Sequence, residues 1–550
     1  MIARRYYYIS PDNNIYMAKT TLLAYKTPII IFCCLLFIAS CKKDGNGIDY
    51  RPNIAIPIVK SSFTIKDILS TQEKNNNIIV GSDGFITLVY TTKLFSKRAE
   101  DIIIIDNQKV NYGFKLNTTQ ANAFNVLPTG QQLPTINIPQ SFPLQLDSAS
   151  LDTIALKAGL IHLKLQSSMP CDFNLSLNLP EVRKNNVGMT IALQRTYNNT
   201  LPIIIDTIID ISNYIIGLTN NGTQQNALNA NLSFSLKKGT NPINANDSIG
   251  VRLDFEDLKF KRIYGKFNDF ALTPEPDTVD ISIFQTAMGL GTIKANNPKL
   301  TTKIKNSFGV HIDASFNVFE GYNDKLTPPT IPFSGPGVPN PLAIQSPSIL
   351  GQSTFTQFSL DSLNSNITDI INSQPSAVIY EIKAKTSTIN SGFILDTSKF
   401  EVEMEVNIPL SGSINNFIFR DTIDYKFDKG DKIESMLFRT NITNGFPFET
   451  GIQVYFADAK AQVIDSLVKD KAYELLLSAA PVDATGKVVS GANSYKQSNL
   501  TLDAATIAKL ASVQKFIIEG RLSSTNQGLM RIYDNYKLDV QLGVKAKLKL

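Results

Sequence analysis

The chain has 550 residues, with 53 basic and 48 acidic side chains, and 43% of its residues are hydrophobic. This near balance of charge argues against nucleic acid, which needs a concentrated basic face, so we expect no nucleic-acid partner. With two histidines, four cysteines and no tryptophan, the chain offers few side chains for cofactor or metal chemistry, and we expect neither a cofactor nor a metal.

Residues 17–41 have the pattern of an export signal. Two lysines precede Pro28–Ser40, an apolar run that is too short to cross a bilayer comfortably as a helix. The run ends in Ile-Ala-Ser-Cys, with small residues directly before Cys41. We therefore expect cleavage between Ser40 and Cys41, which removes residues 1–40, and Met17 is an alternative start. A single transmembrane anchor is the competing interpretation.

The ending at Cys41 resembles the lipobox of bacterial lipoproteins. The resemblance implies that the thiol of Cys41 carries lipid and that the membrane is the first partner of the protein. Anchoring by two or more acyl chains is stable, since each buried methylene contributes about 0.8 kcal/mol. The polar residues that follow predict a flexible tether over 41–55.

The remainder of the chain has the pattern of an all-β protein. Without residues 1–40, which hold four basic residues and one acidic residue, it carries 49 basic and 47 acidic side chains. Polar and apolar residues alternate in many short stretches, for example Val251–Phe255 and Glu401–Val406, as in sheets with one packed face and one wet face. We expect tandem β-sandwich units, immunoglobulin-like or similar, with few short helices. Cys171 is the one cysteine left unmodified, so no internal disulfide is expected.

A turn pattern recurs three times at a spacing of 139 and then 138 residues. It reads [Ile/Leu]-x-[Asn/Ser]-x-[Phe/Met]-[Gly/Pro], and an alternating strand follows each copy. An Asp-Thr pair precedes each copy, at Asp152, Asp277 and Asp421. We interpret the pattern as a strand that ends in a turn, where Asn or Ser bonds the turning backbone. Its signature positions, to which we assign a structural role, are Leu165, Ser167, Met169, Ile304, Asn306, Phe308, Ile442, Asn444 and Phe446.

The repeat sets the expected domain boundaries. An N-terminal β segment covers 56–137, and three β units cover 138–262, 263–410 and 411–550. Short helices are predicted at Thr506–Ala511 and Ile367–Ile371. The proline-rich stretch 325–347 is predicted to be an extended surface loop, either disordered or carrying a binding function.

These features together resemble uncharacterised outer-membrane or surface lipoproteins of the Bacteroidetes kind. The resemblance implies a location in the cell envelope, anchored in the outer membrane and facing either the periplasm or the outside. The turn pattern is also similar to the strand end of the late-embryogenesis-abundant type 2 domain, a small β-sandwich, which supports the same fold.

No arrangement of residues points to catalysis. His162 and His311 fall at non-equivalent places in different units, and Cys171 has no evident histidine partner. Nucleophile-elbow, zinc-protease and phosphate-loop motifs are absent from the sequence. We therefore expect a protein that is not an enzyme.

Three functions fit these observations. The first is a non-catalytic structural or protein-interaction role in the envelope. The second is glycan binding in a nutrient-uptake system, with tyrosines in place of the missing tryptophans. The third is a lipid-binding module, which requires a continuous apolar cavity.

Overall fold

The computed structural model describes residues 51–549 apart from 71–76, 145–148, 220–221, 223–224, 268–270, 272–275, 287–290, 387–390, 426–431, 470–474 and 526–529. The expected signal and lipidation residues, Ser40 and Cys41, lie outside the described residues. Strands predominate and helices are few and short, which confirms the all-β, sandwich-type class.

Sandwich A contains one sheet in the order β4 (Gln108–Lys115), β12 (Ser248–Phe267), β6 (Ala149–Ser167) and β9 (Ile203–Asp210). Its other sheet has the order β5 (Ile136–Pro143), β11 (Ala227–Lys237), β7 (Asp172–Lys184) and β8 (Val187–Arg195). The short β10 (Ile215–Gly217) pairs with both β6 and β7. Phe114 of β4 packs on Phe234 of β11 across the core, with ring centroids 4.9 Å apart.

Sandwich B has the same four-strand order in β3 (Ile86–Arg98), β22 (Lys399–Pro409), β15 (Lys299–Asn306) and β19 (Thr354–Leu360), and β2 (Ile78–Val80) extends this sheet beside β3. The opposite sheet runs β13 (Asp277–Asp280), β20 (Ala377–Thr386) and β16 (Ile312–Tyr322), with β17 (Thr330–Pro332) and β18 (Leu342–Ile344) along its edge. Phe316 and Phe358 pack between the two sheets.

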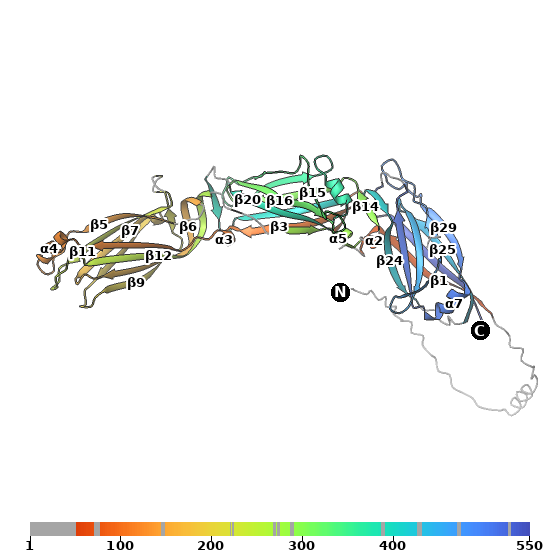
Figure 1. The fold of residues 1–550 in the computed structure, drawn as a ribbon, viewed down its shortest axis with the longest axis horizontal. Coiled ribbons are helices and arrows are strands. Elements are labelled where there is room, and N and C mark those ends of the chain that lie inside the picture. The colour runs from red at the N-terminus through yellow and green to blue at the C-terminus, as the bar shows by residue number, and fades with distance from the viewer. Residues whose placement is uncertain are drawn as a thin grey trace, which may run out of the picture. The chain divides into compact units, whose positions relative to one another are not determined.

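Sandwich C repeats the arrangement with β1 (Asn53–Thr64), β31 (Lys537–Leu548), β25 (Ile433–Asn444) and β29 (Ser494–Thr501). Its second sheet holds β24 (Phe417–Asp424), β30 (Lys515–Ser523), β26 (Glu449–Ala457), β27 (Val463–Ser466) and β28 (Leu475–Leu477). Figure 1 shows the strands of each sandwich gathered in one group, and in sandwiches B and C an early strand joins strands from much later in the chain.

The strands of the expected N-terminal segment 56–137 lie in three different sandwiches. β1 pairs with β31, β3 with β22 and β4 with β12, so each sandwich receives one early strand. A short helix follows each of these strands: α2 (Ile65–Ser70), α3 (Ala99–Ile102) and α4 (Thr118–Asn125). The chain therefore starts sandwiches C, B and A in that order and completes them in the reverse order.

The connections hold the remaining short elements. α7 (Ala504–Lys509), continued by a 3-10 turn at Leu510–Ser512, occupies the first predicted helix, and α6 (Ile367–Asn372) occupies the second. α5 (Ser282–Thr286) follows β13, and β14 (Thr292–Ala295) pairs with β23 (Gly412–Asn415) beside sandwich B. β21 (Gly392–Leu395) pairs with the end of β12.

The proline-rich stretch 325–347 forms ordered structure. It contains β17 and β18, which both pair with β16. Between them Phe333 is buried and stacks on Phe319, with ring centroids 4.2 Å apart. The interpretation of this stretch as a disordered loop is therefore wrong, because an aromatic anchor and two edge pairings hold it on the sheet.

Candidate functional site

The repeated turn has the same internal hydrogen bond in all three sandwiches. The Phe308 N–H donates to Asn306 Oδ1 at 2.9 Å, and the Phe446 N–H donates to Asn444 Oδ1 at 2.9 Å. In sandwich A the Met169 N–H donates to Ser167 Oγ at 3.2 Å. The nine signature side chains are all buried. The turn residues therefore lie in the cores and offer no surface to a ligand; these side chains are Leu165, Ser167, Met169, Ile304, Asn306, Phe308, Ile442, Asn444 and Phe446.

The solvent face of each four-stranded sheet carries a large exposed apolar side chain at one register position of its last strand, and β9 carries a second one, Ile208, which is 61% exposed. Ile204 of β9 is 65% exposed, Phe355 of β19 is 71% exposed and Tyr495 of β29 is 63% exposed. Each lies opposite the residue that precedes the signature Asn or Ser in the adjacent strand. The three side chains thus occupy one equivalent position. Sequence reasoning missed them, because their equivalence depends on strand register.

In sandwich B this face is charged as well as apolar. Phe355 lines a cleft of about 370 Å³. Beside it, Lys305 Nζ lies 3.8 Å from a Glu401 oxygen. One row further along the strands, Lys303 Nζ lies 2.9 Å from Glu405. The hydrogen bond from Asn407, and then that from Lys303, lower the pKa of Glu405. The face therefore combines an apolar ring with alternating positive and negative groups.

The two histidines lie in different sandwiches. His162, in β6, contacts Asp206 of β9 through its Nε2 atom on the solvent face of sandwich A. His311 precedes β16 of sandwich B, and its Nε2 lies 3.3 Å from Asp313. Sequence reasoning correctly separated the two, but it did not identify their carboxylate neighbours.

Cys171 is unsuited to nucleophilic chemistry. Its side chain is 1% exposed, and burial raises the pKa of its thiol to about 12. The reactive thiolate is therefore essentially absent at neutral pH. This agrees with the packing role of the turn in which Cys171 lies.

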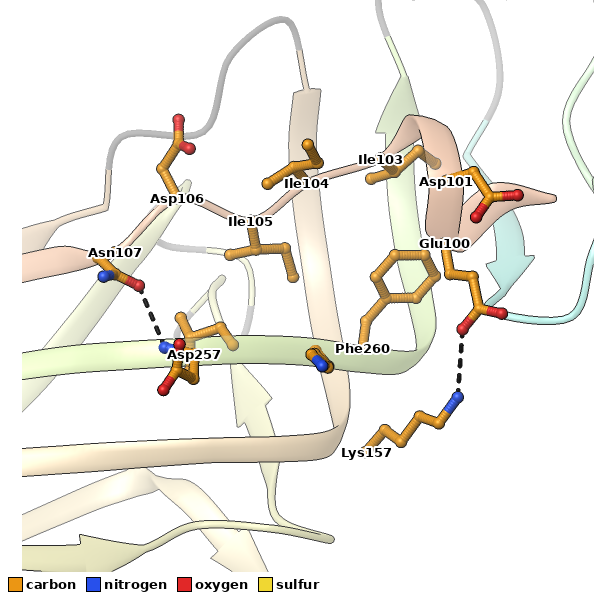
Figure 2. Close-up of a pocket in the computed structure, with 12 residues that line it drawn as sticks. Glu100, Asp101, Ile103, Ile104, Ile105, Asp106, Asn107, Lys157, Asp257 and Phe260 are labelled. Carbon is orange, nitrogen blue, oxygen red and sulfur yellow. Dashed lines mark hydrogen bonds and ion pairs between the residues drawn. The ribbon is translucent and has the colours of Figure 1, made fainter. Parts of the chain in front are cut away.

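A cleft of about 740 Å³ lies between β12 and the linker that joins α3 to β4 (Figure 2). At one end Lys157 Nζ is 3.0 Å from Asp396 and 3.2 Å from Glu100, and these contacts raise the pKa of Lys157. At the other end the backbone N–H of Asp257 donates to Asn107 Oδ1 at 3.1 Å. The charged groups along its walls suit a polar ligand better than a lipid chain; they are Glu100, Asp101, Asp106, Lys157, Asp257 and Lys259.

No family model matches this chain, and no curated protein matches it. Among solved structures, a Parabacteroides distasonis protein described as secreted aligns over 52% of this chain and 88% of its own, at 12% identity and a TM-score of 0.28. The VP2 subviral particle of infectious bursal disease virus aligns over 88% of this chain and 86% of its own, at 8% identity and a TM-score of 0.16. At such TM-scores neither likeness carries an argument about this chain.

Among the residues that the structure describes, no helix combines the length and apolar character needed to cross a bilayer.

Proposed function

We propose that this chain is an exported lipoprotein of the cell envelope, anchored through Cys41 in the outer membrane, with a non-catalytic protein-interaction role. The lipobox-like ending at Cys41 supports the anchor. The residues that directly follow it, 42–47, read Lys-Lys-Asp-Gly-Asn-Gly and suit a polar tether. The sandwiches would then be displayed at the membrane surface as a binding platform.

The anchor is tested by metabolic labelling with an alkyne-tagged palmitate. The wild-type chain is labelled and sediments with membranes, whereas Cys41→Ser is unlabelled and is found in the soluble fraction. Cys171→Ser is the matched control and keeps the label. A Cys41→Ser chain that is still labelled and membrane-bound would overturn the proposal of lipidation.

The repeated exposed side chain carries the interaction proposal. Large apolar groups on a solvent-facing sheet cost hydration unless a partner covers them, and aromatic side chains are enriched at the centres of interfaces. Here such a group recurs at one register position in three sandwiches, as Ile204, Phe355 and Tyr495. Charged and amide groups beside them supply the polar rim that a protein interface needs.

A photo-crosslinking amino acid placed at residue 355 tests this role in cells. We expect discrete crosslinked envelope proteins, and we expect Tyr495→Ser and Ile204→Ser to weaken their capture. Leu363 is the matched control site, because it is 92% exposed but lies in a turn outside the sheet face. Equal crosslinking from residues 355 and 363 would refute the interaction surface.

Glycan binding is the second candidate, because two of the three exposed side chains are aromatic and can stack on sugar rings. Phe355 is flanked by lysine, glutamate and glutamine groups that can bond hydroxyls. A glycan array on the purified chain distinguishes the two functions: a signal that is lost in Phe355→Ala and kept in Leu363→Ala would favour glycans over proteins. The lipid-binding alternative gains no support from the two clefts described above, because charged side chains line both.

A further inference from the structure

The solvent face of sandwich A brings together three side chains that can bind a metal ion. One ligand atom each from His162, Asp254 and Glu256 lies within 4.8 Å of the other two. His162 of β6 stands directly opposite Asp254 of β12, and Glu256 is the next residue of β12 on the same face. All three are therefore held on two paired strands, which place ligands more firmly than loops do.

The environment of these side chains differs from that of ordinary surface residues. The carboxylate of Asp254 is almost fully buried, at 3% exposure, and the ring of His162 is 19% exposed. Asp206, on the next strand, contacts Nε2 of His162. A carboxylate on one ring nitrogen fixes the tautomer and leaves the other nitrogen to a metal, which is the usual support of a metal-binding histidine.

From this geometry we infer that sandwich A carries a site for a zinc-class divalent cation, with His162, Asp254 and Glu256 as ligands and Asp206 as the positioning residue. One imidazole with two carboxylates favours Zn²⁺ over Ca²⁺ or Mg²⁺, which prefer oxygen ligands alone. The inference of this site does not rest on the proposed interaction role or on the lipid anchor.

The site belongs to sandwich A alone among the equivalent positions. In sandwich B the residues opposite one another are Thr301 and Glu405, and in sandwich C they are Arg439 and Gly543. Neither pair contains a histidine. Of these three equivalent positions among the described residues, a cation would therefore bind at one, and the stoichiometry of binding tests this directly.

Positively charged side chains of the protein also face this cluster, and they compete with a metal ion for its carboxylates. Arg252 Nε donates to Asp254 Oδ1 at 2.8 Å, and a metal must share or replace that contact. Lys109 lies opposite Asp254 on β4, and Lys164 lies opposite Arg252 on β6. The other charged groups beside the three ligands on this face are Lys109, Lys164, Asp206 and Arg252.

Isothermal titration of the processed, EDTA-treated chain with ZnCl₂ and separately with CaCl₂ tests the inference. We expect one Zn²⁺ per chain at pH 7.5, bound about ten-fold or more tightly than Ca²⁺. His162→Gln and Glu256→Gln should each weaken Zn²⁺ binding by about ten-fold or more, with circular dichroism showing an intact fold. His311→Gln is the matched control, since it removes the other histidine beside a carboxylate. Absence of Zn²⁺ binding to the wild type, or equal affinity in His162→Gln and His311→Gln, overturns the site.

Discussion

Replacing Asn444 by alanine should destabilise sandwich C more than any surface change. The side chain is fully buried. Its Oδ1 accepts from the Phe446 N–H at 2.9 Å, and its Nδ2 donates to the Phe448 carbonyl at 2.7 Å and to the Ser478 carbonyl at 3.0 Å. Alanine leaves these three backbone groups without their partner. At about 1–1.5 kcal/mol for each group, the loss is about 3–5 kcal/mol.

Two further variants separate the parts of that loss. Asn444→Ser copies Ser167 of sandwich A, whose hydroxyl accepts from the Met169 N–H, so it keeps the turn contact and loses the two amide donations. We expect it to cost about 2–3 kcal/mol, less than alanine. Asn499→Ala, on the exposed face of β29, is the control and should change the free energy of unfolding by no more than about 0.5 kcal/mol.

The assay must report on the stability of each sandwich separately, because a protein with three such units need not unfold in one step. Native-state hydrogen exchange read by mass spectrometry does so, with peptides from Ile433–Ala457 reporting on sandwich C and peptides from β6 serving as an internal reference. Exchange in Ile433–Ala457 should accelerate in the order Asn499→Ala, Asn444→Ser, Asn444→Ala. If Asn444→Ala exchanges there no faster than Asn499→Ala, the hydrogen-bonding role of the turn is wrong.

Three more outcomes follow from the packing and the charges. Gly309→Ala places a Cβ 2.4 Å from the ring of Phe393 and should cost about 1–3 kcal/mol in a denaturant titration, whereas Gly113→Ala meets nothing within 4 Å and should not. Burial opposes ionisation of Asp465, but two lysines outweigh it and hold its pKa well below the usual range. Its stabilisation is therefore present above the unfolded pKa and is lost in acid, so calorimetry should find Asp465→Asn less stable at pH 7, with the difference shrinking below about pH 4. Cys171 should react with Ellman's reagent only after urea unfolds the chain, and rapid reaction of the native protein would contradict its burial.

The strands could be predicted from the sequence because each has one face toward solvent and one toward the core. Val251–Phe255 and Glu401–Val406 alternate in polarity, and both lie in central strands, β12 and β22. The helix at Thr506–Ala511 was predictable from local composition. Its start is fixed by Asp503, which accepts from the Thr506 N–H. Local chemistry was sufficient for these elements.

The pairing of strands that are distant in the sequence could not be predicted. Asn53 pairs with Lys547 at opposite ends of the fold's sequence, and no local signal records that register. The Asp-Thr pairs show the same limit. Asp277 is the first residue of the edge strand β13, and Asp421 lies within the edge strand β24. Asp152 lies instead in β6, which belongs to the other sheet of its sandwich. A two-residue match was too short to distinguish these settings.

The candidate sites were missed for the same reason. His162 was identified as a strand residue, but Asp254 became its neighbour only through the pairing of β6 with β12. Likewise, Phe355 and Tyr495 have no common sequence context and share only a register position. Sequence alone gives the face on which a residue lies; it does not give the residue beside it.

The nested order of the strands has a consequence for biosynthesis. A chain that leaves the ribosome or the export channel from its N-terminus exposes β1 long before β31, so β1 finds its partner only when residues 537–548 have emerged. The strands of sandwich A all lie within residues 108–267, so this sandwich can fold before the rest of the chain has emerged. Sandwiches B and C keep an unpaired strand edge until their later strands emerge. Unpaired edges are prone to aggregate. A chain interrupted before β31 would therefore carry a folded sandwich A and an unpaired, aggregation-prone β1. Chaperones or proteases would bind such a chain through this exposed strand.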